Sequence, residues 1–330
     1  MQPSGALHLG NWQGALANWV RLQDQYRCFF MVADWHALTT RYQNTETLPE
    51  LTREMVIDWL AAGLDPERAV IFCQSWVPAH AELALLLGMI TPLGWLERVP
   101  SYKEKLRELA HREVHSYGFL GYPVLQTADI ALYRARWVPV GQDQVPHVEL
   151  SREVVRRFHA LYGEGVLVEP EPLLTEANVL PGLDGRKMSK SYQNTLTLRE
   201  SPEAVRSKVA TMVTDPARVR RSDPGHPEVC PVFQLHRVFS APDQVAEIDQ
   251  ACRTAAIGCV ECKGRLAAAI NRALDPLRER RAYWEAHGRS VGDILKAGSA
   301  AAQAEAAKTM EAVREAMSLS PQRLMGGDGG

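Results

Sequence analysis

The first half of the chain alternates short apolar runs with segments of helical spacing, and this alternation constrains the fold more than any other feature. The runs have the length and the β-branched and aromatic content of strands, at residues 28–33, 69–73 and 137–140. Around them, apolar residues recur three and four apart, at residues 12–20, 51–62 and 147–159. Strands that alternate with helices form βαβ units, so the sequence predicts an α/β fold with an open parallel sheet.

The chain changes character from Pro202 onward. Strand signals fade there, and Ala, Glu, Lys and Arg dominate at helical spacing. A chain of 330 residues has room for two domains and a sizeable core. We therefore expect a parallel-sheet domain over residues 1–185 and an all-helical domain over residues 186–330.

His8-Leu9-Gly10-Asn11 is the first motif that indicates chemistry. Asn11 opens the first segment of helical spacing, so we expect His8 to Asn11 in the loop that enters a helix. Unpaired backbone N–H groups and the positive end of the helix dipole favour an anion at such an entrance. Gly10 lets a ligand approach the backbone closely, and His8 can donate a hydrogen bond to a phosphate.

Lys187-Met188-Ser189-Lys190-Ser191 is the second motif, and it follows a turn that contains Gly182 and Gly185. Lys187 and Lys190 can place two ammonium groups around a pyrophosphate, where negative charge grows as an α-phosphate is attacked. Taken alone, a Lys/Ser pentamer of this kind reads as a solvated turn. Together with the first motif it predicts a site for ATP.

H-x-G-N followed by K-M-S-K-S resembles the two signatures of class I aminoacyl-tRNA synthetases, and neither is a Walker-type phosphate loop. The resemblance implies a Rossmann-like nucleotide-binding domain, with His8, Asn11, Lys187 and Lys190 as catalytic residues. It also implies ATP contacts from two groups of residues, which are Gln2, Pro3, Ser4, Gly10 and Asn11 near the start, and Gly141, Gln142, Asp143, Val179, Lys187, Met188, Ser189, Lys190 and Ser191 further along.

Three further stretches, at residues 34–39, 122–129 and 140–144, resemble bacterial tryptophanyl-tRNA synthetases. On that resemblance Asp129 accepts a hydrogen bond from the indole N–H of L-tryptophan. Tyr122 and Gln144 hold the α-amino group of the substrate, while His36 and Gln126 help to line the pocket.

The chemistry of indole supports the role that the resemblance implies for Asp129. An indole N–H is a donor only, and a buried acceptor left unpaired would penalise phenylalanine heavily. Without the resemblance, Asp129 would read as a helix cap or a solvated carboxylate. Tyrosyl-tRNA synthetases can also use an Asp in a related pocket, so Asp129 alone leaves a tyrosyl-tRNA synthetase-like enzyme open.

Four cysteines mark the second half, namely Cys230, Cys252, Cys259 and Cys262, separated by 21, six and two residues. Four thiolates suit a zinc ion or an iron–sulfur cluster, and their spacing leaves both open, as well as metal-free thiols. The pattern resembles a motif of a subset of bacterial tryptophanyl-tRNA synthetases. That resemblance implies a 4Fe-4S cluster and favours tryptophan over tyrosine.

Charge and hydropathy narrow the choice of partners. The formal net charge is -2, so contact with tRNA(Trp) requires a local basic patch, and no DNA partner is predicted. One candidate patch comprises Arg218, Arg220, Arg221, Lys263 and Arg265, which without the resemblance reads as a solvated face. The longest uncharged apolar stretch is shorter than the roughly 20 residues of a membrane span, which predicts no membrane role.

The cysteine usage suggests metal binding rather than disulfides, which indicates a reducing compartment and a cytoplasmic location. The family resemblance also implies a homodimer.

Relatives carry several residues before the Gln-Pro-Ser-Gly turn, and these form a central strand of the sheet, whereas here Met1 directly precedes Gln2. We expect the natural chain to begin upstream. If Met1 is the natural start, an impaired or purely binding relative becomes credible.

The reaction that the resemblance implies has two steps. The tryptophan carboxylate attacks the α-phosphate of ATP, which gives tryptophanyl-adenylate and pyrophosphate, and Mg²⁺ is expected to accompany the ATP. A ribose hydroxyl at the 3′ end of the tRNA then takes the aminoacyl group. No protein nucleophile is required, so the expected tasks of the residues are positioning and charge stabilisation. A non-catalytic nucleic-acid-binding or regulatory relative is the other class of function left open.

Overall fold

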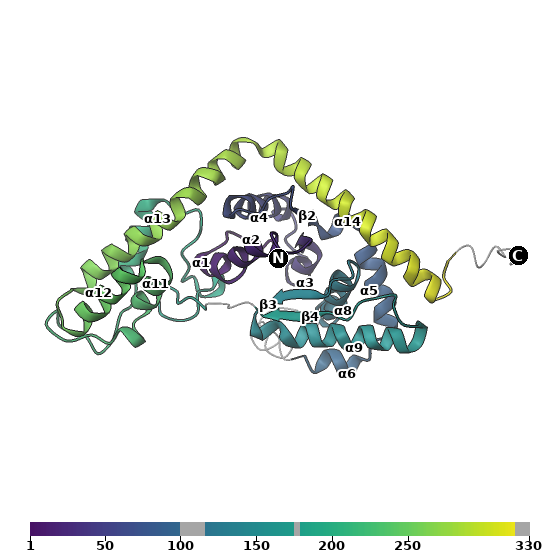
Figure 1. The fold of residues 1–330 in the computed structure, drawn as a ribbon, viewed down its shortest axis with the longest axis horizontal. Coiled ribbons are helices and arrows are strands. Elements are labelled where there is room, and N and C mark those ends of the chain that lie inside the picture. The colour runs from purple at the N-terminus through teal and green to yellow at the C-terminus, as the bar shows by residue number, and fades with distance from the viewer. Residues whose placement is uncertain (100–115, 175–178, 321–330) are drawn as a thin grey trace, which may run out of the picture.

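The computed structural model describes residues 1–99, 116–174 and 179–320 (Figure 1). Four strands are present in these ranges: β1 (Cys28–Val32), β2 (Ala69–Cys73), β3 (Trp137–Val140) and β4 (Glu171–Leu174). The α-helices are α1 (Leu9–Asn11), α2 (Ala17–Leu22), α3 (Asp34–Arg41), α4 (Leu48–Ala62), α5 (Ala79–Ile90), α6 (Leu93–Glu97), α8 (Tyr117–Ala131), α9 (Val145–Tyr162), α10 (Pro202–Thr211), α11 (Pro231–Phe239), α12 (Pro242–Arg253), α13 (Cys259–Ala286) and α14 (Gly288–Ala316). Short 3₁₀ or π segments are η1 (Trp12–Leu16), η2 (Gln74–Trp76), η3 (Gln142–Gln144), η4 (Lys190–Tyr192) and η5 (Pro227–Val229).

The described strands form two parallel pairs. In the first pair Phe30 lies opposite Ile71, and in the second Val138 lies opposite Pro172. Parallel pairing requires a crossover connection, which α3 and α4 supply between β1 and β2. The predicted α/β fold with a parallel sheet is confirmed.

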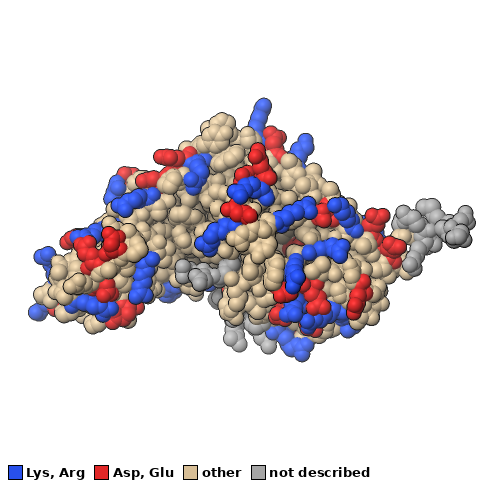
Figure 2. Space-filling model, in the orientation of Figure 1, with Lys and Arg blue, Asp and Glu red and all other residues tan. Residues whose placement is uncertain are grey.

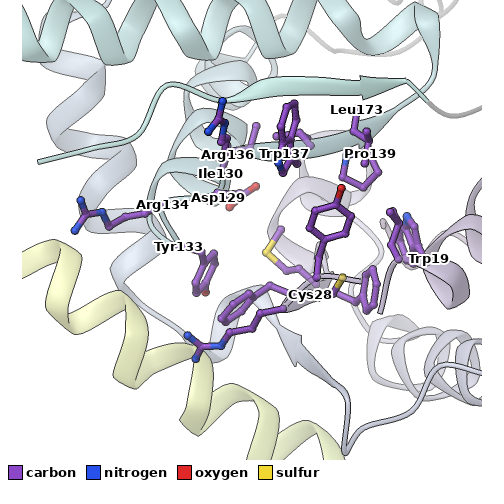
Figure 3. A pocket seen from close by; sticks show the side chains of 18 of the residues that line it. Trp19, Cys28, Asp129, Ile130, Tyr133, Arg134, Arg136, Trp137, Pro139 and Leu173 are labelled. Atoms are coloured by element: carbon purple, nitrogen blue, oxygen red, sulfur yellow. The ribbon is translucent and has the colours of Figure 1, made fainter. Parts of the chain in front are cut away.

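A groove of about 470 Å³ separates β1 from β3, and no strand among the described residues joins the two pairs (Figure 3). Met1 lies at one end of the groove, where its ammonium group donates to the Met31 carbonyl at 2.6 Å. The Ala33 N–H in turn donates to the Met1 carbonyl at 2.8 Å. These two bonds continue the hydrogen-bond pattern of a parallel ladder for one residue alongside β1.

The last two long helices meet at an angle, so that α13 and α14 form two arms over the rest of the molecule (Figure 1). The arm α14 packs on β2, at a point where a Cβ on Gly298 would lie 1.9 Å from the Ile71 carbonyl oxygen. Cys73 N–H also donates to Ser299 Oγ at 3.3 Å. The C-terminal helix thus returns to the sheet, and the expected division at residue 185 stays a prediction.

Two apolar cores hold these elements together. One extends from β1 and α4 to the helices α10, α11 and α13, and the other lies between α5, α8, α9 and the end of α14. Within the first core, Trp19 stacks on Phe30 at 4.9 Å and meets Trp59 edge-on at 5.5 Å between ring centroids. These aromatic contacts fix α2 against the sheet, next to the His8 motif. None of the described helices is long and apolar enough to cross a membrane.

The observed elements differ from the expected ones at a few points. Strands β2 and β3 match the expected ranges to the residue, whereas β1 ends at Val32, one residue early. Strand β4 was not predicted, because its sequence Glu-Pro-Leu-Leu lacks the alternation of a half-buried strand. The first helix already begins at Leu9, so the expectation that His8 to Asn11 form a loop is wrong.

Candidate functional site

The two motifs lie side by side although almost 180 residues separate them in sequence. Leu9 N–H donates to the Leu196 carbonyl and Leu198 N–H to the Leu7 carbonyl, each at 2.9 Å. Residues 7–9 and 196–198 thus form a short antiparallel ladder centred on His8 and Thr197. The backbone itself holds the entrance of α1 next to the Lys187–Ser191 loop.

The ammonium group of Lys190 completes this junction. Its Nζ donates to the Gly5 carbonyl at 2.8 Å and to Ser4 Oγ at 3.2 Å. Gly5 has a φ of +117°, a conformation that L side chains rarely adopt, so a glycine is required at this turn. The Gln2–Gly5 turn therefore presents a backbone carbonyl to the ammonium, and the predicted convergence of the two motifs is observed.

His8 is the N-cap of α1. Its Nδ1 accepts from Asn11 N–H at 3.3 Å, and Asn11 Oδ1 accepts from His8 N–H at 3.1 Å, which is a reciprocal capping arrangement. Burial, and then the charges of Lys190 and Lys187, lower the pKa of His8 to about 4. The ring is neutral at pH 7, and because Nδ1 is an acceptor its proton resides on Nε2. His8 can therefore offer one neutral donor to a phosphate.

The Lys187–Ser191 loop is held from within by Asn194, a residue that the sequence analysis missed. Asn194 Oδ1 accepts from Ser189 N–H at 2.8 Å, while its Nδ2 donates to the Lys187 carbonyl at 3.1 Å and to Asp184 Oδ1 at 2.7 Å. A Cβ on Gly182 would come within 2.3 Å of the Asn194 side chain. The glycine turn before the motif thus leaves room for the side chain that shapes the loop.

The two lysines of the loop differ in environment. Burial, together with the charges of Arg199 and Arg41, lowers the pKa of Lys190 to about 8 against a raising effect of Asp58. The Lys187 side chain is exposed. A polyanion bound here would favour the charged form of both ammonium groups.

The other residues expected to contact ATP are spread over three places. Gln2 and Ser4 are exposed on the first turn, and the Pro3 carbonyl accepts from Arg41 Nη1 at 3.4 Å. Gly141, Gln142 and Asp143 lie at the carboxyl end of β3, where open parallel sheets place their ligand sites. Val179 is exposed. Among the residues that the structure describes, no hydrogen bond joins these last four to the Lys190 loop.

The expected tryptophan-binding residues on α8 share one face of that helix. Tyr122, Gln126 and Asp129 stand at positions i, i+4 and i+7. His36, at the start of α3, approaches the same face, with its Nε2 2.6 Å from Asp129 Oδ2. The ring of Tyr122 meets that of His36 nearly at right angles, with 6.4 Å between the centroids. Four of the five predicted residues therefore lie on or against one face of α8.

Asp129 is held by two further side chains that the sequence analysis missed. Gln74 Nε2 and His80 Nδ1 both lie 2.7 Å from Asp129 Oδ1. Burial acts to raise the pKa of Asp129, but the neighbouring His36 and His80 outweigh it and hold the pKa well below the usual range. The group therefore carries a negative charge at neutral pH.

His80 has a second neighbour in Tyr133. Tyr133 Oη lies 2.7 Å from His80 Nε2, and burial, followed by the charge of Asp129, raises the pKa of Tyr133 far above its usual value. The phenol therefore keeps its proton. Because the ionised Asp129 can only accept, His80 donates to it through Nδ1. No local pattern marked these residues, because each is a polar side chain within an apolar run.

The remaining predicted residues lie around this surface. Tyr122 Oη is 3.4 Å from Nε2 of His147, on α9. Gln144 lies on η3, directly before that helix, and its Nε2 donates to Asp143 Oδ2 at 3.1 Å. Of all the residues expected to bind ATP or tryptophan, only Asp129 lines the groove between β1 and β3 (Figure 3). The groove is therefore distinct from the junction of the two motifs.

The four cysteines of the second half line one small cavity, together with Asp215 and Arg218. Burial, and then the other three cysteines, raise the pKa of Cys262 to about 12, against a lowering effect of Arg218. A Cβ on Gly225 would come within 2.5 Å of Cys252 Sγ, so a glycine lets the backbone approach this thiol closely. Within the described residues, however, no group of three or more His, Cys, Asp or Glu side chains has the geometry of a metal site. The 4Fe-4S cluster that the resemblance implies is therefore not shown.

One of the five residues expected in the basic patch, Arg218, does not belong to it. Arg218 is buried, and its Nη2 donates to the carbonyls of Arg221 and Ile257 at 2.9 and 2.7 Å. Its Nη1 lies 3.8 Å from Cys252 Sγ, so the side chain faces the cysteines and not solvent. Arg265 is paired with two glutamates of its own domain. On the face shown in Figure 2, basic and acidic side chains are interspersed.

The chain was compared with known proteins. A family model described as "tRNA synthetases class I (W and Y)" matches residues 1–275. The chain is 50% identical to the tryptophan–tRNA ligase of Thermotoga maritima, over 97% of this chain and 98% of that protein, and 46% identical to that of Ralstonia nicotianae, over 97% of each.

Solved structures agree with these relatives. The tryptophanyl-tRNA synthetase of Campylobacter jejuni, complexed with ADP and tryptophan, matches with a TM-score of 0.87 at 33% identity over 97% of this chain and 98% of that chain. A tyrosyl-tRNA synthetase from Archaeoglobus fulgidus matches with a TM-score of 0.66 at 23% identity, a likeness that shows the fold alone. The chain belongs to the class I tRNA synthetases and, among them, to the bacterial tryptophanyl-tRNA synthetases.

Proposed function

We propose that the protein is a tryptophan–tRNA ligase, which activates L-tryptophan with ATP and transfers it to the 3′ end of tRNA(Trp). The observation that carries this proposal is the junction of the two motifs, where Lys190 reaches the Ser4–Gly5 turn next to His8. Cationic, neutral and backbone donors meet there on one surface. Such a set of donors fits a triphosphate, whose charge is spread over several oxygens.

The residues act in the first step by binding and by charge stabilisation. The entrance of α1 and His8 Nε2–H bind phosphate oxygens, while Lys187 and Lys190 stabilise the negative charge that develops as the tryptophan carboxylate attacks the α-phosphate. Mg²⁺ accompanies the nucleotide and is held chiefly by phosphate oxygens. No covalent bond to the protein forms, so the rate depends on positioning and electrostatics.

Asp129 selects the amino acid. It is charged, buried and oriented by His36, Gln74 and His80, so it presents a fixed acceptor to the indole N–H. Tyr122, Gln126 and Gln144 complete the pocket, with Tyr122 and Gln144 at the α-amino group. An amino acid without a donor at the indole position would leave the carboxylate unpaired, which is the basis of discrimination.

ATP–pyrophosphate exchange tests this proposal. We expect tryptophan to support exchange and phenylalanine, whose ring has no donor, to support it at least about 1,000-fold less well, on the scale of sites that read a substrate donor. Tyrosine should not replace tryptophan. Exchange with tyrosine in place of tryptophan would point to a tyrosyl-tRNA synthetase-like enzyme. Binding of tRNA without exchange for either amino acid would point to a non-catalytic relative.

We also propose that Cys230, Cys252, Cys259 and Cys262 hold a 4Fe-4S cluster. The fit rests on four thiols around one cavity, on the glycine that admits Cys252, and on the buried cation of Arg218, which suits an anionic thiolate site. When bound, such a cluster cross-links the helices α12 and α13 through metal–thiolate bonds.

Metal analysis and the variant Cys259→Ser test the cluster. Iron and sulfide in equal amounts in protein purified without air would support it, and stoichiometric zinc would contradict it. The variant should lower the melting temperature. If specific affinity for tRNA(Trp) is kept, the metal site acts as a structural cross-link, and if that affinity is lost, it shapes the tRNA surface.

We further propose a cytoplasmic homodimer. Large apolar side chains are exposed along α5 and its neighbours, at Leu85, Met89, Leu93 and Tyr117. Leu85 and Met89 are four residues apart and so share a face of α5. Sedimentation should give a dimer for the unchanged protein and a monomer for Met89→Glu, because the charge would be buried at the interface.

A further inference from the structure

A group of four charged side chains, two of them buried and two partly exposed, lies where α4, α13 and the segment before α10 meet. Glu54 and Asp58 belong to α4, Arg281 belongs to α13, and Arg199 directly follows the ladder segment 196–198. The side chain of Asp58 is 0% exposed and that of Arg281 is 7% exposed. Two carboxylates face two guanidinium groups, so the four charges balance.

Each carboxylate bridges both arginines. Glu54 Oε2 lies 2.7 Å from Arg199 Nη1 and 2.5 Å from Arg281 Nη2. Asp58 accepts from Arg281 through Oδ1 and from Arg199 Nη2 through Oδ2, the latter at 3.3 Å. Glu285, one turn further along α13, lies 2.9 Å from Arg281 Nη2 at the surface. Guanidinium groups are planar and rigid, so these contacts define one relative position of the three segments.

The same group reaches the ladder that joins the two ATP motifs. Asp58 Oδ2 lies 3.5 Å from the N–H of Leu7, the residue before His8. On the opposite side of the ladder, Arg199 follows Leu198, which donates to the Leu7 carbonyl. The Asp58–Arg199 pair therefore clamps the ladder from both of its segments. Arg199 does not contact the Lys190 ammonium, whose hydrogen-bond partners are Ser4 and Gly5.

Stability alone does not account for a group that buries the charges of Asp58 and Arg281 and partly buries those of Glu54 and Arg199. Replacing a buried ion pair by apolar side chains of similar volume is often neutral or stabilising, because the desolvation of the charges offsets their attraction. A directional network, in contrast, selects one arrangement among several of similar packing energy. Because the network lies beside the ATP motifs, the arrangement that it selects is the one in which those motifs are held for the reaction.

We propose that Arg199 is a positioning residue for tryptophan activation, which clamps the 196–198 segment to Glu54 and Asp58 and thereby holds Lys190 against the Ser4–Gly5 turn. Through Arg281 the same clamp ties the position of α13, and with it the helical part of the chain, to the ATP site. The inference rests on the proposed function. Arg199 touches neither ATP nor tryptophan and acts only through Lys190.

Steady-state ATP–pyrophosphate exchange with matched variants tests this role. Arg199→Met should lower kcat at least tenfold while the KM for tryptophan changes less than twofold, and Arg199→Lys should recover part of the loss. Arg206→Met is the control, because Arg206 is an exposed arginine on α10 that pairs only with Glu203 among the described residues. It should leave kcat unchanged. The melting temperature of each variant is measured alongside.

A double-mutant cycle separates positioning from general damage. If Arg199 acts through Lys190, then Arg199→Met should have less than a twofold effect in a Lys190→Ala background. An equal loss in both backgrounds, or no loss in the unchanged background, would overturn the inference. If Arg199→Met lowers the melting temperature strongly, the cycle is run with Arg199→Lys and judged by the same criterion. Absence of tryptophan-dependent exchange in the unchanged protein would instead overturn the proposed function.

Discussion

At the scale of single residues, the side chains of the candidate site form hydrogen bonds with residues from distant parts of the chain. Lys190 bonds to Gly5, His80 to Asp129, and Arg199 to Asp58. The resemblance to the synthetases predicted roles for Lys190 and Asp129, because each stands in a stretch that matches the family. Nothing in the neighbourhood of His80 or Arg199 identified them, because their role depends on what lies opposite in space.

Lys190→Ala should slow adenylate formation more than it weakens binding. Removal of one donor that stabilises transition-state charge costs about 100- to 1,000-fold in rate, so a fall of that size in exchange kcat is expected. The Kd of tryptophan, measured by equilibrium dialysis, should change little, because Lys190 faces the Ser4–Gly5 turn. Equal losses in rate and in tryptophan affinity would argue against the role in charge stabilisation.

Activation should also lose rate as the pH rises. The pKa of Lys190 is lowered to about 8, and the ammonium form is the active one. The kcat/KM for ATP, which reports the free enzyme, should therefore decline as the pH passes through about 8. Lys190→Arg is the matched control, because a guanidinium group stays charged in this range and should abolish the decline. The same decline in that variant would assign the titration to another group.

At the scale of elements, periodicity predicted which segments are strands and helices but not what each packs against. β2 and β3 were predicted to the residue, and the helical character after Pro202 is confirmed. That α14 covers β2 could not be predicted, because a helical pattern shows that one face is buried without showing the surface that buries it. β4 was not predicted, because its residues do not alternate between polar and apolar.

Two glycines in α14 provide a test of this packing. Gly298→Ala places a Cβ against the Ile71 carbonyl and should destabilise the fold by about 1–3 kcal/mol through overpacking. Gly292 lies on the same helix with no atom within 4 Å of the added carbon, so Gly292→Ala should stabilise by about 0.5–1 kcal/mol. Urea unfolding measures both. Similar effects of the two substitutions would mean that α14 does not lie tightly on β2.

At the scale of the whole molecule, the groove between β1 and β3 divides the described sheet into two parallel pairs. Met1 continues the ladder along β1 for one residue, with its amino group buried and its pKa lowered to about 5 by that burial. The groove is lined largely by apolar side chains of both strands (Figure 3). An extended apolar segment running into Met1 would satisfy the backbone groups of the facing strand edges.

An added N-terminal extension tests this reading of the groove. Six residues rich in Val and Ile before Met1 span about 20 Å as a strand and convert the buried amino group into a peptide N–H. We expect the melting temperature to rise by at least about 5 °C. A Gly/Ser extension of equal length is the control and should give no rise. Equal effects of both extensions would show that the groove does not accept a strand.

The sequence by itself determined the class of fold and the family, and it predicted two phosphate-binding motifs, because these depend on local periodicity and on short patterns with specific chemistry. The tertiary structure alone decided that Asn194 shapes the lysine loop, that His80 orients Asp129, that Arg218 is buried against the cysteines, and that Asp58 and Arg199 clamp the ladder. These roles arise from contacts between segments that are far apart along the chain. A local sequence pattern can predict that a side chain is buried. It cannot predict which group a buried polar side chain contacts, because that partner comes from a distant segment of the folded chain.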